Sequence, residues 1–155
     1  SVAFNNYTEV RVGFGSSGGT NARIEVSGGT LDITGSALYL GEQDNGLLTL
    51  SGGIMTLDGL FSLGRGGSTG GGTDNMTGGT LFADDIVQVN GVFHFDGGMI
   101  SLEGDQTSIL SETWFDAMEG TTATFDGTRT VIIPEPTIGA LLFGFAGLLG
   151  LRRRR

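Results

Sequence analysis

The sequence predicts an all-β fold: a short right-handed parallel β-helix with three strands per coil and about four to five coils, followed by a C-terminal hydrophobic helix. Two observations lead to it. Glycine supplies 30 of the 155 residues, and a Gly-Gly doublet recurs in a fixed context. Proline occurs only twice, and 38% of the residues are hydrophobic. The lack of a Gly-X-Y period excludes collagen, and the apolar content disfavours disorder.

The segments after the four doublets have the pattern of short strands. Apolar residues stand two and four positions after each doublet, and the position between them is polar in three of the four copies. Alternation with a period of two is typical of a strand that buries one face. The apolar pairs are Leu31/Ile33, Met55/Leu57, Leu81/Ala83 and Ile100/Leu102.

Two further apolar-x-apolar segments belong to each unit. One precedes the doublet, at residues 24–26, 48–50 and 93–95, and keeps only Met76 before the third doublet. The other ends in glycine, at residues 10–13, 38–41 and 61–64. We place a fourth copy of it at 87–90, where Asn90 replaces the glycine, because Asn is the next-best residue for a left-handed backbone.

The spacing between these segments predicts a triangular coil. Five positions always separate the last apolar residue before a doublet from the first core residue after it, and six or seven positions separate the next two segments. The third corner varies in length, at residues 13–23, 41–47 and 64–75. Coils with two rigid corners stack their strands into parallel sheets. An antiparallel sandwich explains the alternation equally well but not the constant corner.

We divide the chain into a solenoid at 1–102, an irregular β cap and linker at 103–133, and a C-terminal segment at 134–155. The cap segment breaks the repeat. It adds Trp114, Phe115 and Met118, and strands are predicted at 122–125 and 129–133. A solenoid end needs such a cover, because an open edge invites pairing with other chains. Ser1 and the short strand expected after it indicate an N-terminus that has been cut away.

The charge balance argues against nucleic-acid binding. Residues 1–151 hold 17 acidic residues against four arginines, a formal net charge of −13, and the other four arginines are 152–155. Phosphate binding needs a basic face, so we expect no nucleic-acid partner. The chain has no cysteine, which excludes disulfides and thiolate sites.

No residue pattern indicates an enzyme, and we expect no catalytic residue. The glycines at 13–18 match GxGxxG, but no helix follows them. His94 is the only histidine and takes an outward position without a regularly spaced partner. Asp84 and Asp85 are neighbours at a corner rather than a pair across a cleft.

The variable corners offer oxygen ligands, and we weighed them as a calcium site. Calcium takes six to eight oxygens, and acids on neighbouring coils could supply them. The repeat GGxGxD is absent, however, so we expect solvated loops, no metal site and no cofactor, and keep calcium stabilisation as an alternative. The residues concerned are Glu42, Asp44, Asn45, Thr73, Asp74 and Asn75.

The composition changes sharply at Pro134. Pro134, Glu135 and Pro136 precede an uncharged apolar stretch at 137–151, and four arginines follow. As a helix the stretch would be about 22 Å long, shorter than the roughly 30 Å of a bilayer core. We expect it to be a transmembrane helix whose basic tail stays on the cytoplasmic side.

This order of motif, apolar helix and arginine cluster resembles the PEP-CTERM sorting signal. The resemblance implies that an exosortase, a membrane protease or transpeptidase, recognises Pro134, Glu135 and Pro136. It implies that Arg152, Arg153, Arg154 and Arg155 hold the tail in the bacterial inner membrane until cleavage. It also implies export and release to the cell surface or matrix of a bacterium that makes extracellular polysaccharide. The glycine-rich repeat resembles the β-solenoids of such proteins and of autotransporters.

The sequence therefore favours a non-enzymatic exported surface or extracellular-matrix protein with a structural or adhesive role. Its expected partners are an exosortase, transiently the inner membrane, and extracellular polysaccharide. The alternative is a carbohydrate-binding or carbohydrate-active β-helix. That alternative would need aromatic side chains along one outer face, and only Tyr39 and Phe82 are expected to point outward.

Overall fold

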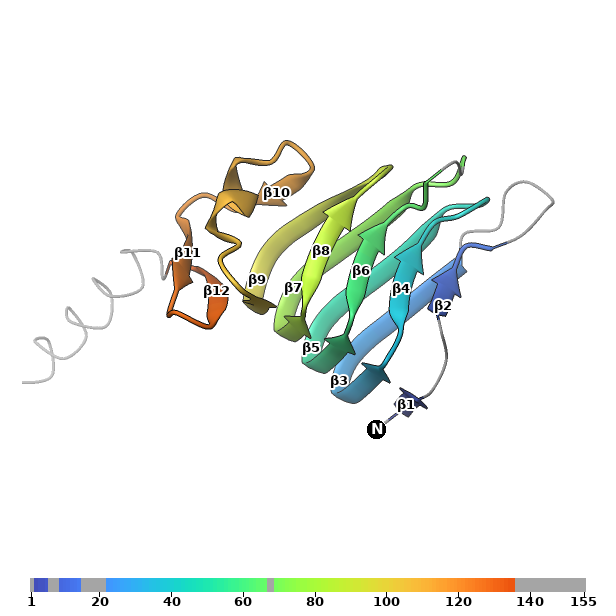
Figure 1. Cartoon of the computed structure of the whole chain (residues 1–155), viewed down its shortest axis with the longest axis horizontal. Helices are drawn as coiled ribbons and strands as arrows, with labels where there is room; N and C mark the ends of the chain where they lie inside the picture. Colours follow the sequence, from blue (N-terminus) through green and yellow to red (C-terminus); the bar gives the residue numbers. More distant parts are fainter. Residues whose placement is uncertain (1, 6–8, 15–21, 67–68, 136–155) are drawn as a thin grey trace, which may run out of the picture.

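The computed structural model describes residues 2–5, 9–14, 22–66 and 69–135 (Figure 1). The expected helix at 137–151, Pro136 and the four C-terminal arginines lie outside these residues. Within the described part of the chain, no helix is long and apolar enough to cross a membrane.

The described chain is all-β apart from one short 3₁₀ helix, η1 (Thr107–Ser111). Strands of 12 or 13 residues alternate with strands of four residues through the repeat region, and the C-terminal strands have three to six residues. The strands are β1 (Val2–Asn5), β2 (Glu9–Val12), β3 (Ala22–Thr34), β4 (Ala37–Leu40), β5 (Gly46–Asp58), β6 (Leu60–Leu63), β7 (Gly72–Ala83), β8 (Asp85–Gln88), β9 (Gly91–Glu103), β10 (Phe115–Ala117), β11 (Thr121–Phe125) and β12 (Arg129–Pro134).

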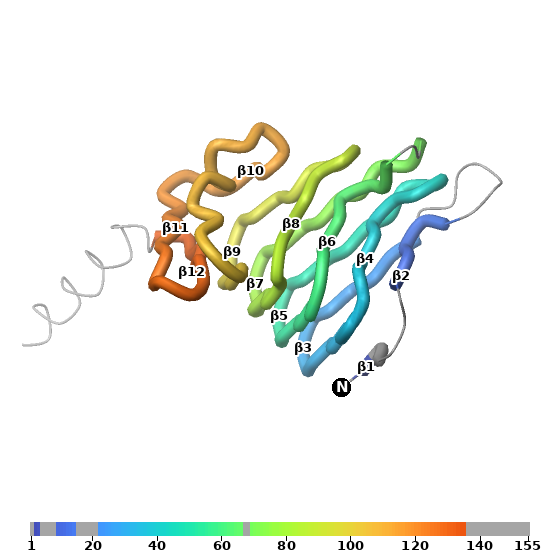
Figure 2. The backbone as a smooth tube through the Cα atoms, viewed as in Figure 1, coloured from blue at the N-terminus to red at the C-terminus, as the bar shows by residue number. Residues whose placement is uncertain are grey.

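These strands form a parallel β-solenoid of about four coils. The long strands stack in the order β3-β5-β7-β9, with the four-residue β1 beside β3, and the short strands stack opposite them in the order β2-β4-β6-β8. Every ladder within the repeat is parallel. Figures 1 and 2 show the two sheets side by side, with the N-terminus and the β11–β12 hairpin at opposite ends of the stack. The parallel ladders confirm the solenoid over the antiparallel sandwich.

Each coil contains two strands, not the three predicted. The segments before and after a doublet belong to one long strand, whose pairing resumes beyond the doublet after a register shift. Between β3 and β5, for example, Val26 pairs with Leu50 and Ser27 already pairs with Gly52. The doublet is therefore a β-bulge, which bends a strand without ending it.

Glycine is required at this bulge for two reasons. The second glycine of every doublet has a positive φ, between 73° and 93°. A Cβ on Gly53 would also lie 2.6 Å from the carbonyl oxygen of Gly29 in the preceding coil. Both a left-handed backbone and a close strand contact exclude a side chain.

The inward-facing residues form one continuous core, as the alternation predicted. All eight apolar residues that follow the doublets are at most 7% exposed. In the central coils the core also contains the apolar residues predicted for the segments before the doublets and for the segments that end in glycine. Its largest fully buried side chains are Phe61, Phe93, Phe95, Ile33, Leu38, Leu40, Leu48, Leu50, Met55, Leu57, Leu63 and Met76.

The predicted fourth copy of the short strand is wrong by one residue. β8 pairs Phe61 with Ile86, which is buried, while Val87 pairs with Ser62 and is only partly buried. Val89 follows the strand and is 47% exposed. The Val-x-Val pattern at 87–89 has the apolar spacing of the repeat. However, Ile86 is the side chain that continues the inward column of Leu38 and Phe61.

The last coil is covered by the strands after residue 103. β10 pairs in parallel with the first half of β9, and β12 pairs antiparallel with its second half. β11 and β12 form a hairpin, which confirms the strands predicted at 122–125 and 129–133. Phe115 stacks on Phe93 with ring centroids 5.2 Å apart, so the aromatic core extends into the cover.

Arg129 ties this cover to the last two coils. Its Nε donates to Ser101 Oγ (2.8 Å), and its Nη2 donates to the carbonyl oxygens of Ser101 (2.8 Å) and Ala83 (2.9 Å). Three partly buried hydrogen bonds to one cation bridge β7, β9 and β12.

We expect Arg129→Ala to lower the free energy of unfolding by about 1.5–3 kcal/mol, since it removes charge-assisted hydrogen bonds. The matched control is Arg23→Ala, which removes an exposed arginine that pairs with the equally exposed Glu25. Its cost should stay below about 1 kcal/mol. Urea unfolding of both variants measures the difference, and equal costs would show that Arg129 does not hold the cover in place.

Candidate functional sites

The two described residues of the proline-glutamate-proline motif, Pro134 and Glu135, continue directly from the cover. Pro134 is the last residue of β12 and pairs with Thr121, and the Glu135 N–H donates to the Gly120 carbonyl oxygen at 3.0 Å. No linker separates the folded strand from the motif. Pro136 and Arg152–Arg155 lie outside the described residues, so the geometry of the complete signal is not given by this structure.

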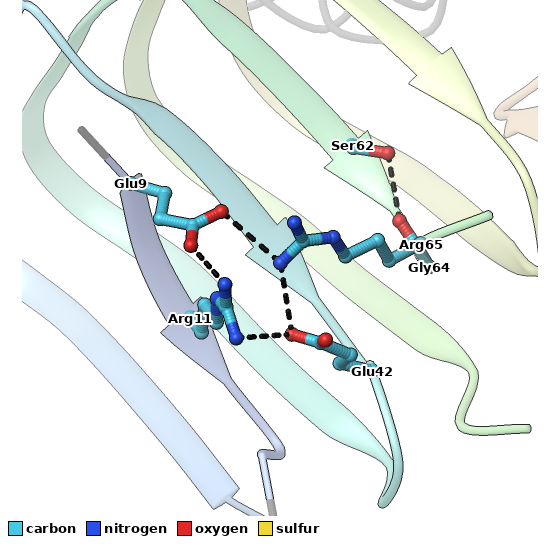
Figure 3. A network of polar contacts seen from close by, with 6 residues as sticks. All are labelled: Glu9, Arg11, Glu42, Ser62, Gly64 and Arg65. Atoms are coloured by element: carbon cyan, nitrogen blue, oxygen red, sulfur yellow. Dashed lines mark hydrogen bonds and ion pairs between the residues drawn. The ribbon is translucent and has the colours of Figure 1, made fainter. Parts of the chain in front are cut away.

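A network of four charged side chains crosses the outer face of the short-strand sheet (Figure 3). Arg11 pairs with Glu9 on the same strand and with Glu42 in the next coil, at 3.3 Å. Arg65, one coil further on, reaches Glu9 at 3.0 Å and Glu42 at 3.2 Å. The network alternates in sign and connects three successive coils.

The charges of this network pair with one another across the coils, which is typical of a structural role. The hydrogen bond from Arg11 lowers the pKa of the Glu9 carboxyl, and Glu9 in turn raises the pKa of Arg11. Two arginines balance two glutamates, so the patch presents no excess charge to a ligand. Arg65 also lies over the ring of Tyr39, 4.8 Å from its centroid, and therefore covers an aromatic face that the sequence placed outside.

All four arginines of residues 1–151 are engaged. Arg11 and Arg65 belong to the network, Arg23 pairs with Glu25, and Arg129 holds the cover. The acidic residues of the body exceed these cations by 13. Within the described ranges, therefore, no group of arginines is left to neutralise a phosphate backbone.

The corner that follows the long strands is acidic. Asp84 follows β7, and its pKa is raised by partial burial and then by the neighbouring carboxylates of Glu103 and Asp58; Arg129 acts in the opposite direction. These carboxylates come from three successive coils. Asp84 lies at the corner between β7 and β8, as predicted, whereas Asp85 is the first residue of β8.

His94 has a partner that the sequence did not indicate. Its Nδ1 lies 2.9 Å from Oδ2 of Asp116, and both side chains are substantially exposed. The contact arises because β10 lies beside β9 and puts Asp116 directly opposite His94. The outward orientation of His94 is confirmed. The 22-residue separation explains why spacing alone could not reveal the pair.

Asp74 is a carboxylic acid buried among the apolar side chains of the core. It is 1% exposed and lies in register between Leu48 and Phe93, two fully buried residues. Its Oδ1 has no hydrogen-bond partner among the residues that the structure describes. Burial raises the pKa of this carboxyl well above its usual range, and the Asn75 N–H opposes the shift only in part. The sequence contained a sign of this burial, because in the third copy of the segment before the doublet residue 74 takes the position that Leu48 holds in the second copy.

The structure does not bring the loop residues weighed for calcium into one site. Asp74 faces the core, Glu42 is held by the arginines, and the Asn45 side chain accepts the Gly71 N–H at 3.1 Å. Among the residues with assigned positions, no three acidic or histidine side chains converge on a point suited to a metal. The edge instead carries an open groove of about 320 Å³, lined by Asn45, Gly46, Leu47, Gly71, Gly72, Thr73, Gly91 and Val92.

Gly13, the first residue of the GxGxxG match at 13–18, makes a structural contact. The Gly13 carbonyl oxygen accepts three backbone N–H groups, from Glu42, Gln43 and Asp44, at 3.0–3.2 Å. This oxygen fixes the variable corner of the next coil. Residues 15–18 of the match lie outside the described part.

Comparison of the chain with known protein families, with curated proteins and with solved structures finds no match.

Proposed function

We propose that this chain is an exported bacterial surface or extracellular-matrix protein with a structural or adhesive role, sorted and cleaved by an exosortase. The observation that carries the proposal is the order of residues 134–155: Pro-Glu-Pro, 15 uncharged mostly apolar residues, and four arginines. The apolar stretch acts as a transient inner-membrane anchor, and the arginines keep its end on the cytoplasmic side. Cleavage then releases the acidic body.

The fold supports a structural role. A parallel solenoid grows by adding identical coils, and its stability comes from contacts between neighbours. The ion-pair network connects three successive coils, and the Gly-Gly bulge recurs in every long strand from β3 to β9, so both features link one coil to the next. We also propose the divisions at 1–102, 103–133 and 134–155, a C-terminal hydrophobic helix at 137–151, and a right-handed coil, since parallel crossovers are almost always right-handed.

Carbohydrate binding or cleavage remains the alternative function, with less support. An outer aromatic platform would favour it, but the guanidinium of Arg65 covers Tyr39, and Phe82 is partly buried. We also propose extracellular polysaccharide as a partner of the released body, which would contact it through the hydroxyls and carboxylates of the protein surface. Neither a metal nor another cofactor is part of the proposal.

Replacing Pro134, Glu135 and Pro136 together by alanine is expected to leave the protein uncleaved in the inner membrane. The exosortase would lose the motif it recognises, while the membrane helix and arginines stay. Cell fractionation and the mass of the chain measure the result. Normal release of this variant would contradict the assignment.

Two controls separate sorting from folding. Pro134 belongs to β12, so a variant with only Glu135 and Pro136 replaced preserves the strand and should still block cleavage. Asp116→Ala changes an exposed residue of the cover and should be released normally. Protease resistance of the body in all three variants excludes unfolding as the cause of retention.

A further inference from the structure

The sheet of short strands ends at β8, in the interior of the sequence (Figure 1). Within the described residues, no strand pairs with the side of β8 that faces away from β6. In each earlier coil a short strand follows its long strand directly, but β9 is followed by η1. Because a 3₁₀ helix uses its backbone hydrogen bonds within its own turns, η1 takes the place of a fifth short strand without continuing the ladder.

An open groove of about 260 Å³ lies between β8 and η1. Its floor is closed by Ile86 from β8 and Ile109 from η1, which belong to the hydrophobic core and are only 4% and 5% exposed. The groove therefore does not lead into the core, and the surface that it offers to a ligand comes from the residues around this floor.

Polar side chains stand on both sides of the groove. Gln88 at the end of β8 is exposed, as are Ser108 and Glu112, while Gln106 before η1 is half-buried. In the part of the chain with defined positions, none of these four side chains forms a hydrogen bond or ion pair with another residue. Each amide offers two donors and an acceptor, and the carboxylate offers acceptors only. The groove thus presents both donors and acceptors to a ligand rich in hydroxyl groups.

Trp114, the single tryptophan of the chain, lines the same groove and is partly exposed. Its carbonyl oxygen accepts the Phe93 N–H at 2.9 Å, which ties its backbone to β9. Its ring meets that of Phe115 perpendicularly, with centroids 6.0 Å apart. Among the described aromatic rings, none is stacked in parallel on the indole. Trp114 therefore adds a large aromatic surface, held in place by the cover, to the polar groove.

We propose that the groove between β8 and η1 binds a neutral glycan, with one sugar ring against the indole of Trp114 and the sugar hydroxyls on Gln88, Gln106 and Glu112. One face of a pyranose carries mainly C–H groups and packs on an aromatic ring, whereas its rim carries hydroxyls that need donors and acceptors. The proposal gives a binding site to the polysaccharide partner proposed above, and it rests on that proposal only for the identity of the ligand in the cell.

The charge of the protein favours a neutral glycan over an acidic one. Glu112 is the one charged residue that lines the groove. Residues 1–151 carry a formal net charge of −13. This field repels uronate or sulfate groups, and no arginine lines the groove to pair with them.

An extended peptide that adds a strand to β8 fits the groove less well. Strand addition gains specificity from pockets for alternate side chains of the peptide. The aliphatic residues Ile86 and Ile109 are buried in the floor and leave no such pocket. β8 is also only four residues long, so the new ladder would contain few hydrogen bonds.

Tryptophan fluorescence of the full chain tests the proposal directly, because Trp114 is the only emitter of its kind. The protein is kept in a detergent without a sugar headgroup and titrated with neutral oligosaccharides of glucose, galactose, mannose and N-acetylglucosamine, and with a hexuronate oligomer. We expect a saturable change in emission with at least one neutral oligosaccharide and none with the hexuronate.

Replacement of Gln88 and Gln106 together by alanine should weaken this binding at least about 10-fold, because two amide hydrogen-bonding groups are lost. The matched control is Gln43→Ala, which removes an exposed glutamine at a variable corner and should bind as the native chain does. Trp114→Phe keeps a ring against Phe115 and should also weaken binding, as measured by calorimetry. Unchanged melting temperatures exclude unfolding as the cause.

Three results would overturn the proposal: no saturable change with any neutral oligosaccharide, equal affinity in the double glutamine variant and the Gln43→Ala control, or binding of the hexuronate alone. A change produced only by a synthetic peptide with the sequence of residues 60–64 would assign the β8 edge to strand addition and would overturn it as well. The sorting proposal is tested separately, since the glutamine variants should be cleaved and released normally. Failure of glycan binding with normal release would therefore remove this site and leave the sorting assignment intact.

Discussion

Replacement of Leu50 by aspartate is expected to unfold the solenoid. Leu50 is 1% exposed and lies between Val26 and Met76 in the central coils. The change removes a buried side chain, at a cost of about 2–5 kcal/mol, and adds a carboxylate without a partner. The total stability of a domain is only about 5–15 kcal/mol. Far-UV circular dichroism and urea unfolding measure the loss.

Two further variants separate the causes. Leu50→Ala creates the cavity alone, so the difference between the Asp and Ala variants measures the buried carboxyl. Thr49→Asp puts the same carboxylate on the outer face, between Glu25 and Asn75. Its cost should be below about 1 kcal/mol, from repulsion by Glu25. If Thr49→Asp and Leu50→Asp cost the same, the inward and outward positions have been assigned wrongly.

Sequence spacing was sufficient for the stack and its core. The doublets fix where the backbone bulges, and the alternation on either side fixes which residues face inward, so Leu31 and Met55 could be placed without coordinates. Both signals are local, and each is repeated four times. Repetition matters because it turns a weak local pattern into a constraint that all coils must share.

The details that sequence analysis missed depend on pairing between coils. A bulge and a corner both use Gly-Gly with positive φ, and only the ladder on either side shows that the strand continues. Val89 fits the repeat by type, but the register of β8 with β6 selects Ile86 instead. His94 and Asp116 meet because β10 folds back onto β9, and no period in the sequence encodes that contact.

Asp74 shows a different kind of failure, in which the periodicity was correct but the residue type was unexpected. The third copy places residue 74 in the column of Leu48 and Phe93, and the structure keeps that register although the side chain is a carboxyl. Apolar contacts in the same strand, such as Met76, offset the cost of burying it. A lone polar residue in an apolar column therefore stays inside when its neighbours hold the register.

This buried carboxyl should make the protein less stable as the pH rises. The pKa of Asp74 is raised in the folded state by burial, while in the unfolded chain it returns to about 4. The folded state then binds more protons above pH 4, so the free energy of unfolding falls as the pH rises toward the folded pKa. The slope contributed by this residue is at most about 1.4 kcal/mol per pH unit.

Asp74→Asn isolates that contribution because asparagine has nearly the same shape and does not titrate. The other 16 acidic residues contribute alike to both proteins, so the difference between their urea-unfolding free energies from pH 4 to pH 8 reports Asp74 alone. The native protein should lose stability relative to the variant as the pH rises. Asp74→Leu, which copies Leu48, should gain about 1–3 kcal/mol at neutral pH by removing the unpaired Oδ1. A difference that stays constant with pH would mean that Asp74 is ionised in the folded core, and that a partner for its charge enters the solenoid.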